Sequence, residues 1–393
     1  MASQTRVAVA GVGYSTTGRR TGLSSRQLAT QAARAAFADC GMTPKDIDGV
    51  SLLWTVAGFE PPGVERLDSQ DVGYMLGITP LNFFSTEGGV SPAFVAPAIR
   101  AVAAIKAGLC HTCIAFRVIN QSLNSTEVLA QAGADAMTRA EGDEQFNRPF
   151  GSGLPLTSIA GLATQRHMAR FGTKEEHFGR HVMAQREFAS LNEDAIFRQP
   201  LTLDDYFASR YVSKPVRLLD CDYPVDSASA VIFTTEERAR DFRKKPVFVE
   251  ATALASSRYF TFEIDDMDHG SIYHCANTLW SRTALAPKDV SCAQLYDGFT
   301  IITLKWLEAL GFCPEGEVGP FIADGNTRRG GRLPVNTDGG ACNVGRRHGA
   351  NFCIESVRQL RGECGPRQVP GARVSVWANS TGFMTGAMLM TAD

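Results

Sequence analysis

The chain has 393 residues, of which 44% are hydrophobic and 20% are charged, and its formal net charge is −2. This composition is typical of a globular protein, long enough for two domains or for one domain with an insertion. The mixed charges argue against nucleic acid as the main partner, which needs a clustered basic face. No apolar run approaches the ~20 residues of a membrane span, and the first residues lack the apolar core of a signal peptide, so we expect a cytoplasmic location without membrane attachment.

The first elements predicted along the chain are a strand, a helix and a second strand. The apolar strand RVAVAGVG starts at Arg6, and the helical stretch LATQAARAAFADCG follows it. Pro44-Lys45-Asp46 then leads into an apolar strand that ends near Trp54. This order is typical of an α/β architecture.

A glycine-rich turn, STEGGVSP at residues 85–92, precedes a predicted buried helix. The helix is indicated by apolar residues at the spacing of one buried face: Val95, Ala98, Ile99, Val102, Ile105 and Leu109. Pro97 fits only in the first turn of this helix or at a kink near its start. Many enzymes place a nucleophile at such a turn, because a helix N-terminus favours an anion. Here the tip of the turn carries only Gly88 and Gly89.

Ten cysteines are scattered along the chain, and we expect them to be free and buried. Cys110 and Cys113 have C-x-x-C spacing, but they span a helix end and the strand CIAFRV, and no second pair lies at zinc-site spacing. The acidic stretch 263–268, beside His269 and His274, is typical of a solvated loop. The sequence therefore assigns no metal.

An internal repeat is the strongest indication of the fold. GMTPKDIDGVSLLW (41–54) returns as ALAPKDVSCAQLYD (284–297). The flanking segments PVFVEATA, YHCANTLWSRTA, IESVRQLRGEC and RVSVWAN correspond, in the same order, to the strand, the two helices and the strand CIAFRV of the first copy. Several elements at similar spacing predict a duplicated β/α half.

The repeat divides the chain into three predicted units. The two halves are residues 1–122 and 244–393, and residues 123–243 between them are expected to form a loop domain that caps the cleft. Two such halves with buried central helices predict an α/β fold of stacked α, β, α, β and α layers. Ligand sites in such folds gather at strand ends and domain junctions.

Several segments carry a family resemblance: the central helix after its small-residue turn, NTDGG at 336–340, ANSTGFMTGAM near the C-terminus, PVRLLDCDYPVDSASAVIFTTEERARD and QLYDGFTIITLKWLEALGFC. They are similar to the thiolase superfamily, and within it to the lipid-transfer-protein-type branch of the sterol carrier protein thiolases. The likeness covers nearly the whole chain. It implies the thiolase fold, five αβαβα layers built from two similar halves with an inserted loop domain.

The resemblance implies a nucleophilic cysteine at the turn before the first central helix and a second cysteine near the C-terminus. The first position falls on Gly89, which cannot attack a thioester, so no acyl-enzyme is expected there. Two glycines also suit a plain tight turn, and the absent side chain leaves room for a bulky substrate carbon. The second position falls in 379–382, which has no cysteine, and we expect backbone N–H groups around Gly382 to hold a thioester oxygen.

A thiolase N-E-A-F loop corresponds to Tyr296-Asp297-Gly298-Phe299. From the residues alone, Tyr296 is a strand-end tyrosine with a buried ring. The related aldolases that cleave steroid acyl-CoA side chains carry a tyrosine here in a Y-D-x-F-T context, and the resemblance implies that Tyr296 is the base. This work near neutral pH requires its pKa of about 10 to be lowered, or a transient proton relay. Asp297 either orients Tyr296 or, as we expect, caps the following helix.

The thiolase G-H-P position falls on Arg346, where the aldolases are implied to have a second tyrosine, followed two residues on by a histidine that matches His348. Arg346 is a poor proton donor but a strong electrostatic clamp for a developing oxyanion. Arg346 and Arg347 also suit a solvated or anion-binding loop that touches CoA phosphates. His348 has a pKa suited to proton shuttling, or it is a structural histidine bonded to backbone.

Together these positions predict an aldolase, a carbon–carbon lyase. A retro-aldol reaction needs a base and enolate stabilisation but no nucleophile. We expect cleavage of a β-hydroxyacyl-CoA, by resemblance a steroid or bile-acid side chain, to a ketone or aldehyde and acetyl- or propionyl-CoA. The CoA thioester is the substrate, and no cofactor is expected in this chain.

The resemblance also implies partners. The related aldolases have a homodimer core paired with a small OB-fold protein that carries a zinc ribbon, which gives a heterotetramer with any zinc in the partner. Two other functions stay open, the second of them because the second tyrosine is absent. One is a thiolase-like acyltransferase with an unrecognised nucleophile, and the other is a non-catalytic subunit that binds acyl-CoA or scaffolds a partner.

Overall fold

The computed structural model describes residues 5–53, 67–87, 92–120, 156–257, 269–380 and 384–393. Most of their strands form one nine-stranded sheet with the order β3-β2-β4-β7-β1-β8-β11-β10-β9, beside a separate β5-β6 pair. The strands are β1 (Val7–Tyr14), β2 (Gly49–Leu53), β3 (Phe83–Glu87), β4 (Thr112–Asn120), β5 (Tyr211–Ser213), β6 (Val216–Arg217), β7 (Asp226–Thr235), β8 (Val247–Ser256), β9 (Cys292–Leu295), β10 (Val374–Ser380) and β11 (Met384–Ala392).

The two halves of the sheet repeat one pairing pattern, which confirms the predicted duplication. In the first half β7 is antiparallel to β1 and β4, and β2 is parallel to β4. In the second half β11 is antiparallel to β8 and β10, and β9 is parallel to β10. The strands β1 and β8 join the halves through an antiparallel pairing.

The repeated Pro-Lys-Asp motif forms the same local structure in both halves. Each copy is a short 3-10 turn, at Pro44–Asp46 and Pro287–Asp289. In each copy the aspartate carboxylate accepts the N–H of the residue before the proline at 2.8 Å. The proline needs no N–H partner at this first position, so three residues are enough to stop a helix and start a strand.

Helices cover both faces of the sheet. The described helices are α1 (Ser25–Cys40), α2 (Ser69–Leu76), α3 (Val95–Lys106), α6 (Leu156–Phe171), α7 (Glu175–Ser190), α8 (Leu203–Ala208), α9 (Glu236–Ala239), α10 (Gly270–Trp280), α11 (Thr300–Ala309), α12 (Val318–Ala323), α13 (Ala341–Val344) and α14 (Ala350–Arg361). None of them combines the length and apolar content needed to cross a bilayer.

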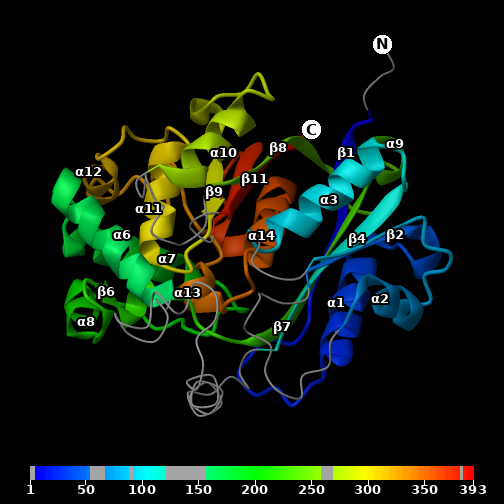
Figure 1. The fold of residues 1–393 in the computed structure, drawn as a ribbon, viewed down its shortest axis with the longest axis horizontal. Coiled ribbons are helices and arrows are strands. Elements are labelled where there is room, and N and C mark those ends of the chain that lie inside the picture. The colour runs from blue at the N-terminus through cyan, green and yellow to red at the C-terminus, as the bar shows by residue number, and fades with distance from the viewer. Residues whose placement is uncertain (1–4, 54–66, 88–91, 121–155, 258–268, 381–383) are drawn as a thin grey trace, which may run out of the picture.

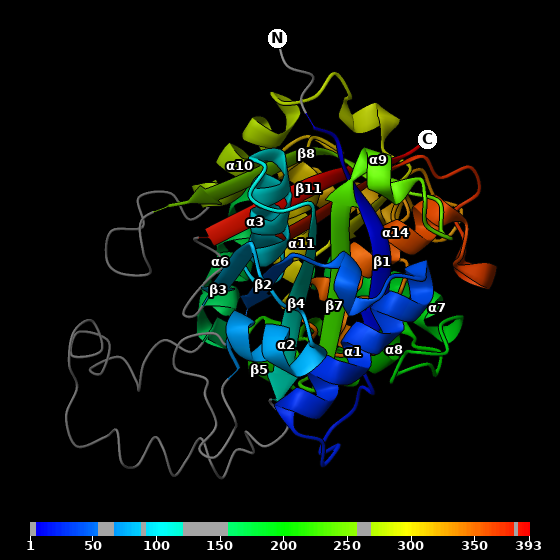
Figure 2. The ribbon, with the colours of Figure 1, turned by 90° about the vertical axis from the view of Figure 1, so that its right-hand side faces the viewer.

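The helices α3 and α14 lie between the two halves of the sheet (Figure 1). Each of them contacts strands of both halves, α3 through β4 and β11, and α14 through β10 and β1. Helices α1 and α2 cover the outer face of the first half (Figure 2), and α10 and α11 lie against the second half. This arrangement gives the five expected layers.

The predicted buried face of α3 is confirmed except at Ile99, which is only partly buried, and at its end. Pro97 lies in the first turn, and Val95, Ala98, Val102 and Ile105 are buried. Leu109 was predicted to belong to this face, but the helix ends at Lys106 and Leu109 is 55% exposed. The reason is Gly108, whose φ of 73° reverses the chain. The N–H groups of residues 108 and 109 donate hydrogen bonds to carbonyls of the last helical turn.

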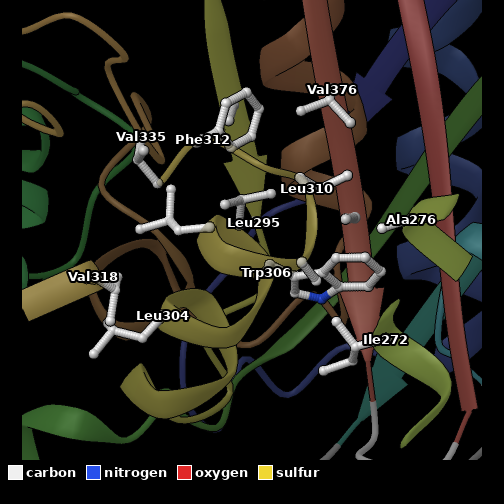
Figure 3. Packing of buried hydrophobic residues seen from close by; sticks show 14 of the residues in the cluster. Ile272, Ala276, Leu295, Leu304, Trp306, Leu310, Phe312, Val318, Val335 and Val376 are labelled. Atoms are coloured by element: carbon white, nitrogen blue, oxygen red, sulfur yellow. The ribbon is translucent and has the colours of Figure 1, made fainter. Parts of the chain in front are cut away.

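The second half has its own hydrophobic core between α10, α11 and strands β9 and β10. Trp306 of α11 is fully buried there and faces Ile272 and Ala276 of α10 (Figure 3). Leu295, at the end of β9, belongs to the same cluster. This packing holds α11, and with it the loop that connects β9 to α11.

The residues assigned to the loop domain do not all leave the sheet. Helices α6 and α7 pack against α11 on the outside of the second half. Residues 226–235 of the same stretch form β7, which lies between β4 and β1. Nine of its ten residues are buried, as suits a strand covered on both faces. Residues 226–235 therefore belong to the sheet rather than to a cap, and the division into three units remains a prediction.

His181 of α7 gives a prediction for stability against pH. It is fully buried, neither ring nitrogen has a hydrogen-bond partner among the described residues, and burial lowers its pKa to about 4. In the unfolded chain the pKa is about 6.5, so the unfolded state binds the proton first as the pH falls, which costs the folded state up to about 3 kcal/mol between pH 6.5 and 4. Urea unfolding at several pH values should show this loss in the wild type and a flatter dependence in His181→Leu.

A matched control for this prediction is His274→Leu, because His274 is exposed on α10. Its pH dependence should follow that of the wild type. Equal slopes for His181→Leu and the wild type would show that His181 does not carry the effect.

Candidate active site

Tyr296 directly follows β9 and begins the loop to α11. Its N–H donates to the carbonyl of Ala378 in β10 at 2.9 Å, and its carbonyl accepts from the Thr303 hydroxyl at 3.1 Å. The ring packs edge-on against Phe352 of α14, and the residue is 8% exposed. The tyrosine therefore has a fixed backbone and a buried ring at the end of a central strand.

The Tyr296 hydroxyl meets a carboxylate that the sequence analysis did not single out. It donates to Oδ2 of Asp222 at 3.2 Å. The other oxygen, Oδ1, accepts from Nε of Arg346 at 2.7 Å and forms an ion pair with its Nη2, also at 2.7 Å. Asp222 lies in the segment LLDCDYP, which in the sequence was noted only as one of the segments that carry the family resemblance. One carboxylate thus joins two of the predicted site residues.

The charges in this cluster oppose the formation of a tyrosinate. Burial, and then the neighbouring Asp222 carboxylate, raise the pKa of Tyr296 well above 10, although Arg346 acts in the other direction. Burial also raises the pKa of Asp222, and Arg346 counteracts it. Tyr296 is therefore a neutral phenol whose hydroxyl donates a hydrogen bond to an arginine-paired carboxylate.

His348 lies two residues beyond Arg346 and contacts a second arginine that the sequence analysis missed. Its Nδ1 accepts from Nη2 of Arg117 at 2.6 Å, so a proton on the ring resides on Nε2. Burial, Arg117 and Arg346 lower the pKa of His348 far below its ordinary value. The ring is a neutral imidazole, which counts against the first of the two alternatives, a proton shuttle with an ordinary pKa.

Arg117 is fixed from the other half of the molecule. It lies in β4, and its Nη1 donates to the carbonyl of Leu53 at 3.2 Å and to that of Val118 at 2.9 Å. Leu53 is the position that corresponds to Tyr296 in the repeat. The ends of the two equivalent strands, β2 and β9, thus supply groups to one cluster. The signal for Arg117 in the sequence was a single charge within an apolar strand.

The carbonyl of His348 links the cluster to the two segments that contain the predicted substrate-binding glycines. It accepts the N–H of Phe94, at the start of α3, at 3.0 Å and the side-chain amide of Asn379 at 3.3 Å. Gly89 and Gly382 themselves lie outside the described residues.

Asp297 caps a helix, but not the one expected. The helix that follows it, α11, has Phe299 at its N-cap and no side-chain cap. The Asp297 carboxylate instead accepts the N–H of Ala341, at the start of α13, at 2.9 Å and the side-chain amide of Gln185 at 2.8 Å. Burial raises its pKa to about 7. Its oxygens hold α13 in place and do not contact the Tyr296 hydroxyl.

Arg346 and Arg347 do not form a solvated pair. The Arg347 guanidinium lies over the ring of Tyr14, 4.1 Å from its centroid, and the residue is 3% exposed. Arg346 turns to Asp222 and keeps about a quarter of its side chain exposed. Only Arg346 therefore reaches the cluster around Tyr296.

All ten cysteines are free, and none of those near the cluster is an activated thiol. Burial raises the pKa of Cys221 to about 12, and burial together with the neighbouring Asp297 raises the pKa of Cys342 well above its ordinary value. A nucleophilic cysteine requires the thiolate, which these surroundings disfavour. Among the described residues, the site offers proton-transfer groups and no activated cysteine.

Comparison with known proteins agrees with this chemistry. A family model described as "Thiolase C-terminal domain-like" matches residues 254–391. The chain is 34% identical to the 17-hydroxy-3-oxo-4-pregnene-20-carboxyl-CoA lyase of Mycobacterium tuberculosis, with 98% of this chain and 99% of the relative covered. It is 33% identical to a steroid side-chain-cleaving aldolase of Thermomonospora curvata, with 98% of both chains covered.

A solved structure described as the Ltp2-ChsH2(DUF35) aldolase superposes with a TM-score of 0.85 at 31% sequence identity. The match covers 99% of this chain and 98% of that chain. The similarity therefore includes both halves of the sheet and the segments between them.

Proposed function

Because the chain belongs to the thiolase superfamily, in the family of the steroid side-chain-cleaving aldolases, we propose that it catalyses retro-aldol cleavage of a β-hydroxyacyl-CoA. The products are a ketone or aldehyde and a short acyl-CoA such as acetyl- or propionyl-CoA. The proposed substrate class is a steroid or bile-acid CoA thioester, since a 17-hydroxy-20-carboxyl-CoA carries its hydroxyl β to the thioester carbonyl.

The observation that carries this proposal is the Tyr296 hydroxyl, which is buried and hydrogen-bonded to Asp222 at 3.2 Å. A retro-aldol reaction starts when a base removes the proton of the β-hydroxyl group, and the carbon–carbon bond then breaks to leave a thioester enolate. We assign Tyr296 as the group that removes that proton. The raised pKa values of Cys221 and Cys342 count against an acyltransferase that uses either thiol.

We assign electrostatic roles to Arg346 and His348, which follow α13 in the chain. Arg346 supplies positive charge beside Tyr296, where it favours a developing enolate oxyanion. His348 is a neutral ring whose Nδ1 accepts a hydrogen bond from Arg117. It is proposed to donate a hydrogen bond from Nε2 rather than to shuttle protons. Gly89 is proposed to leave room for the substrate carbon, and backbone N–H groups near Gly382 to bind the thioester oxygen.

We also propose an assembly with a homodimer core and a small OB-fold, zinc-ribbon partner, giving a heterotetramer. Two observations support it. A solved aldolase that superposes on this chain is described as a complex with a DUF35 subunit. Strand β3 ends the described sheet, and its Phe84 is 55% exposed, so a second copy can pair with that edge and cover an apolar side chain.

The experiment that tests the function is product analysis. The protein, alone and co-expressed with a DUF35-type partner, is incubated with 17-hydroxy-3-oxo-4-pregnene-20-carboxyl-CoA and with a panel of smaller β-hydroxyacyl-CoAs. Mass spectrometry should detect a free ketone or aldehyde and a shortened acyl-CoA in equal amounts. Light scattering of the co-expressed sample reports the assembly, for which we expect two copies of each chain.

Other outcomes favour the other functions. Acyl label that stays on the protein would indicate an acyltransferase with an unrecognised nucleophile. Binding of the acyl-CoA without turnover, in the presence of the partner, would indicate a non-catalytic subunit. Either result overturns the aldolase proposal.

Gly298 gives a prediction for the geometry of the base. A Cβ at this position would lie 2.8 Å from the Tyr296 hydroxyl oxygen and 2.7 Å from its Cε1. Gly298→Ala should therefore displace the ring from Asp222 and lower kcat by about 100-fold, the typical cost of a 1 Å misplacement. Steady-state kinetics and thermal unfolding measure the two effects.

A control for this substitution is Gly18→Ala, where the new Cβ would lie 3.8 Å from Thr21, an ordinary contact. Its kcat should equal that of the wild type. A fully active Gly298→Ala variant would show that the ring position next to Asp222 does not matter for turnover.

A further inference from the structure

Asp222 is held against the loop of Tyr296 by its own backbone. Its N–H donates to the carbonyl of Gly298 at 3.2 Å, and the preceding residue, Cys221, forms an antiparallel bridge with Phe299. The backbone contact fixes the carboxylate relative to the tyrosine. The residue is 8% exposed, so protein groups rather than bulk water set its surroundings.

The two oxygens of this carboxylate face different partners. Oδ2 accepts the hydroxyl of Tyr296 at 3.2 Å, and Oδ1 accepts the Nε–H of Arg346 and forms an ion pair with its Nη2, both at 2.7 Å. The phenol proton therefore already points at a carboxylate whose charge is balanced by a guanidinium. The phenol oxygen retains lone pairs that can accept a hydrogen bond from a substrate hydroxyl.

Other groups near Tyr296 are occupied. The Asp297 carboxylate accepts from Ala341 and Gln185, and Nδ1 of His348 accepts from Arg117. Asp222 is therefore the carboxylate that the described structure aligns with the phenol.

We propose that Asp222 is the proton acceptor behind Tyr296 in the aldol cleavage proposed above, on which this inference rests. As the phenol oxygen takes the proton of the substrate β-hydroxyl, the phenol passes its own proton to Oδ2 of Asp222. The carbon–carbon bond breaks, and its electron pair moves into the thioester enolate. Tyr296 stays neutral throughout, so no tyrosinate forms.

The proton returns by the same route. Asp222 gives it back to the phenol, and the phenol protonates the α-carbon of the enolate, which yields the short acyl-CoA. No oxidant, reductant or other co-reactant is needed, because the proton removed in the first step is used in the second. Asp222 acts through Tyr296 and does not touch the substrate.

The pairing with Arg346 links proton transfer to enolate stabilisation. Before the reaction, the charges of Asp222 and Arg346 cancel. When Asp222 takes the proton, the Arg346 charge becomes uncompensated at the step in which the enolate acquires its negative charge. The total charge of cluster and substrate is constant, and the cation is available when it stabilises the oxyanion.

The test uses the assembled protein and the variant Asp222→Asn, which keeps the shape of the side chain but cannot accept a proton. For a steroid acyl-CoA that the wild type cleaves, kcat should fall by about 100-fold, at the lower end of the range for loss of a proton-transfer group, with KM within about 3-fold. A second readout is the exchange of α-protons of propionyl-CoA with D2O, measured by mass spectrometry. It should fall in parallel.

The matched control is Asp220→Asn. Asp220 lies two residues away, is also buried, and also accepts a tyrosine hydroxyl, from Tyr206 at 2.9 Å. Its kcat and exchange rate should stay near wild type. In a Tyr296→Phe background, Asp222→Asn should cause no further loss, because two residues that act as one relay are not additive.

Several results would overturn the relay. They are wild-type kcat and exchange in Asp222→Asn, an equal loss in Asp220→Asn, or an independent further loss in the double variant. If Asp222→Asn does not fold, the variant Arg346→Gln replaces it in the test. Without its counter-ion, the buried Asp222 takes up a proton and cannot accept another. Wild-type kcat in Arg346→Gln therefore also overturns the relay. A wild type that exchanges α-protons but cleaves no β-hydroxyacyl-CoA contradicts the proposed function alone, whereas one that does neither contradicts both.

Discussion

Replacing Tyr296 with phenylalanine is expected to lower kcat for cleavage of a β-hydroxyacyl-CoA by about 100- to 10,000-fold, with KM close to that of the wild type. Phenylalanine keeps the ring, which packs against Phe352 with centroids 6.3 Å apart. It removes only the hydroxyl that contacts Asp222. Because the lost group transfers a proton and contributes little to binding, the effect should appear in kcat.

The control for this substitution is Tyr206→Phe. Tyr206 is 1% exposed, and its hydroxyl donates to Asp220 at 2.9 Å, so the same change is made to a buried Tyr–Asp pair that does not include Tyr296. It should cost about 1 kcal/mol of unfolding free energy and leave kcat unchanged. Turnover by Tyr296→Phe at the wild-type rate would rule out Tyr296 as the base.

Trp306→Ala is expected to have the largest effect on stability, a loss of about 3–5 kcal/mol in the free energy of unfolding. Trp306 is fully buried in the core of the second half, between α11, α10 and the strands. Its indole nitrogen has no hydrogen-bond partner among the described residues, so the loss comes from packing alone. Denaturant unfolding monitored by circular dichroism measures it.

Trp306→Phe is the graded companion to this variant. It keeps an aromatic ring and leaves a smaller cavity, so its loss should lie between those of the wild type and Trp306→Ala. A loss below about 1 kcal/mol for Trp306→Ala would mean that the surrounding helices close the cavity, contrary to the rigid packing of a protein interior.

The duplicated fold could be predicted because its signals are local. Each Pro-Lys-Asp motif forms its turn through contacts within four residues, and each apolar run has a pattern that indicates a strand. The same signals repeated in order imply the same topology twice. They did not show the place of β7. The strand at 226–235 returns to the first half after a long excursion, and local spacing in the sequence does not indicate such a return.

The site could be predicted only in part. Tyr296, Arg346 and His348 were predicted as candidate site residues through positions that match a family. Asp222 was not, because it lies 74 residues before Tyr296 and nothing in LLDCDYP distinguishes a site carboxylate from a surface one. Arg117 had a weak signal, a charge inside an apolar strand, which becomes meaningful only when its partner, 231 residues away, is known.

The sequence by itself determined the two similar halves, the central helices, the absence of cysteine at both thiolase positions and the tyrosine after β9. Only the tertiary structure decided which charges meet: Asp222 with Tyr296 and Arg346, Arg117 with His348, and Asp297 with α13 instead of α11. The physical reason is distance along the chain. Helix and strand formation depends on neighbours within a few residues, whereas the protonation state of a buried group depends on whichever charges the packing of remote segments brings within a few ångströms.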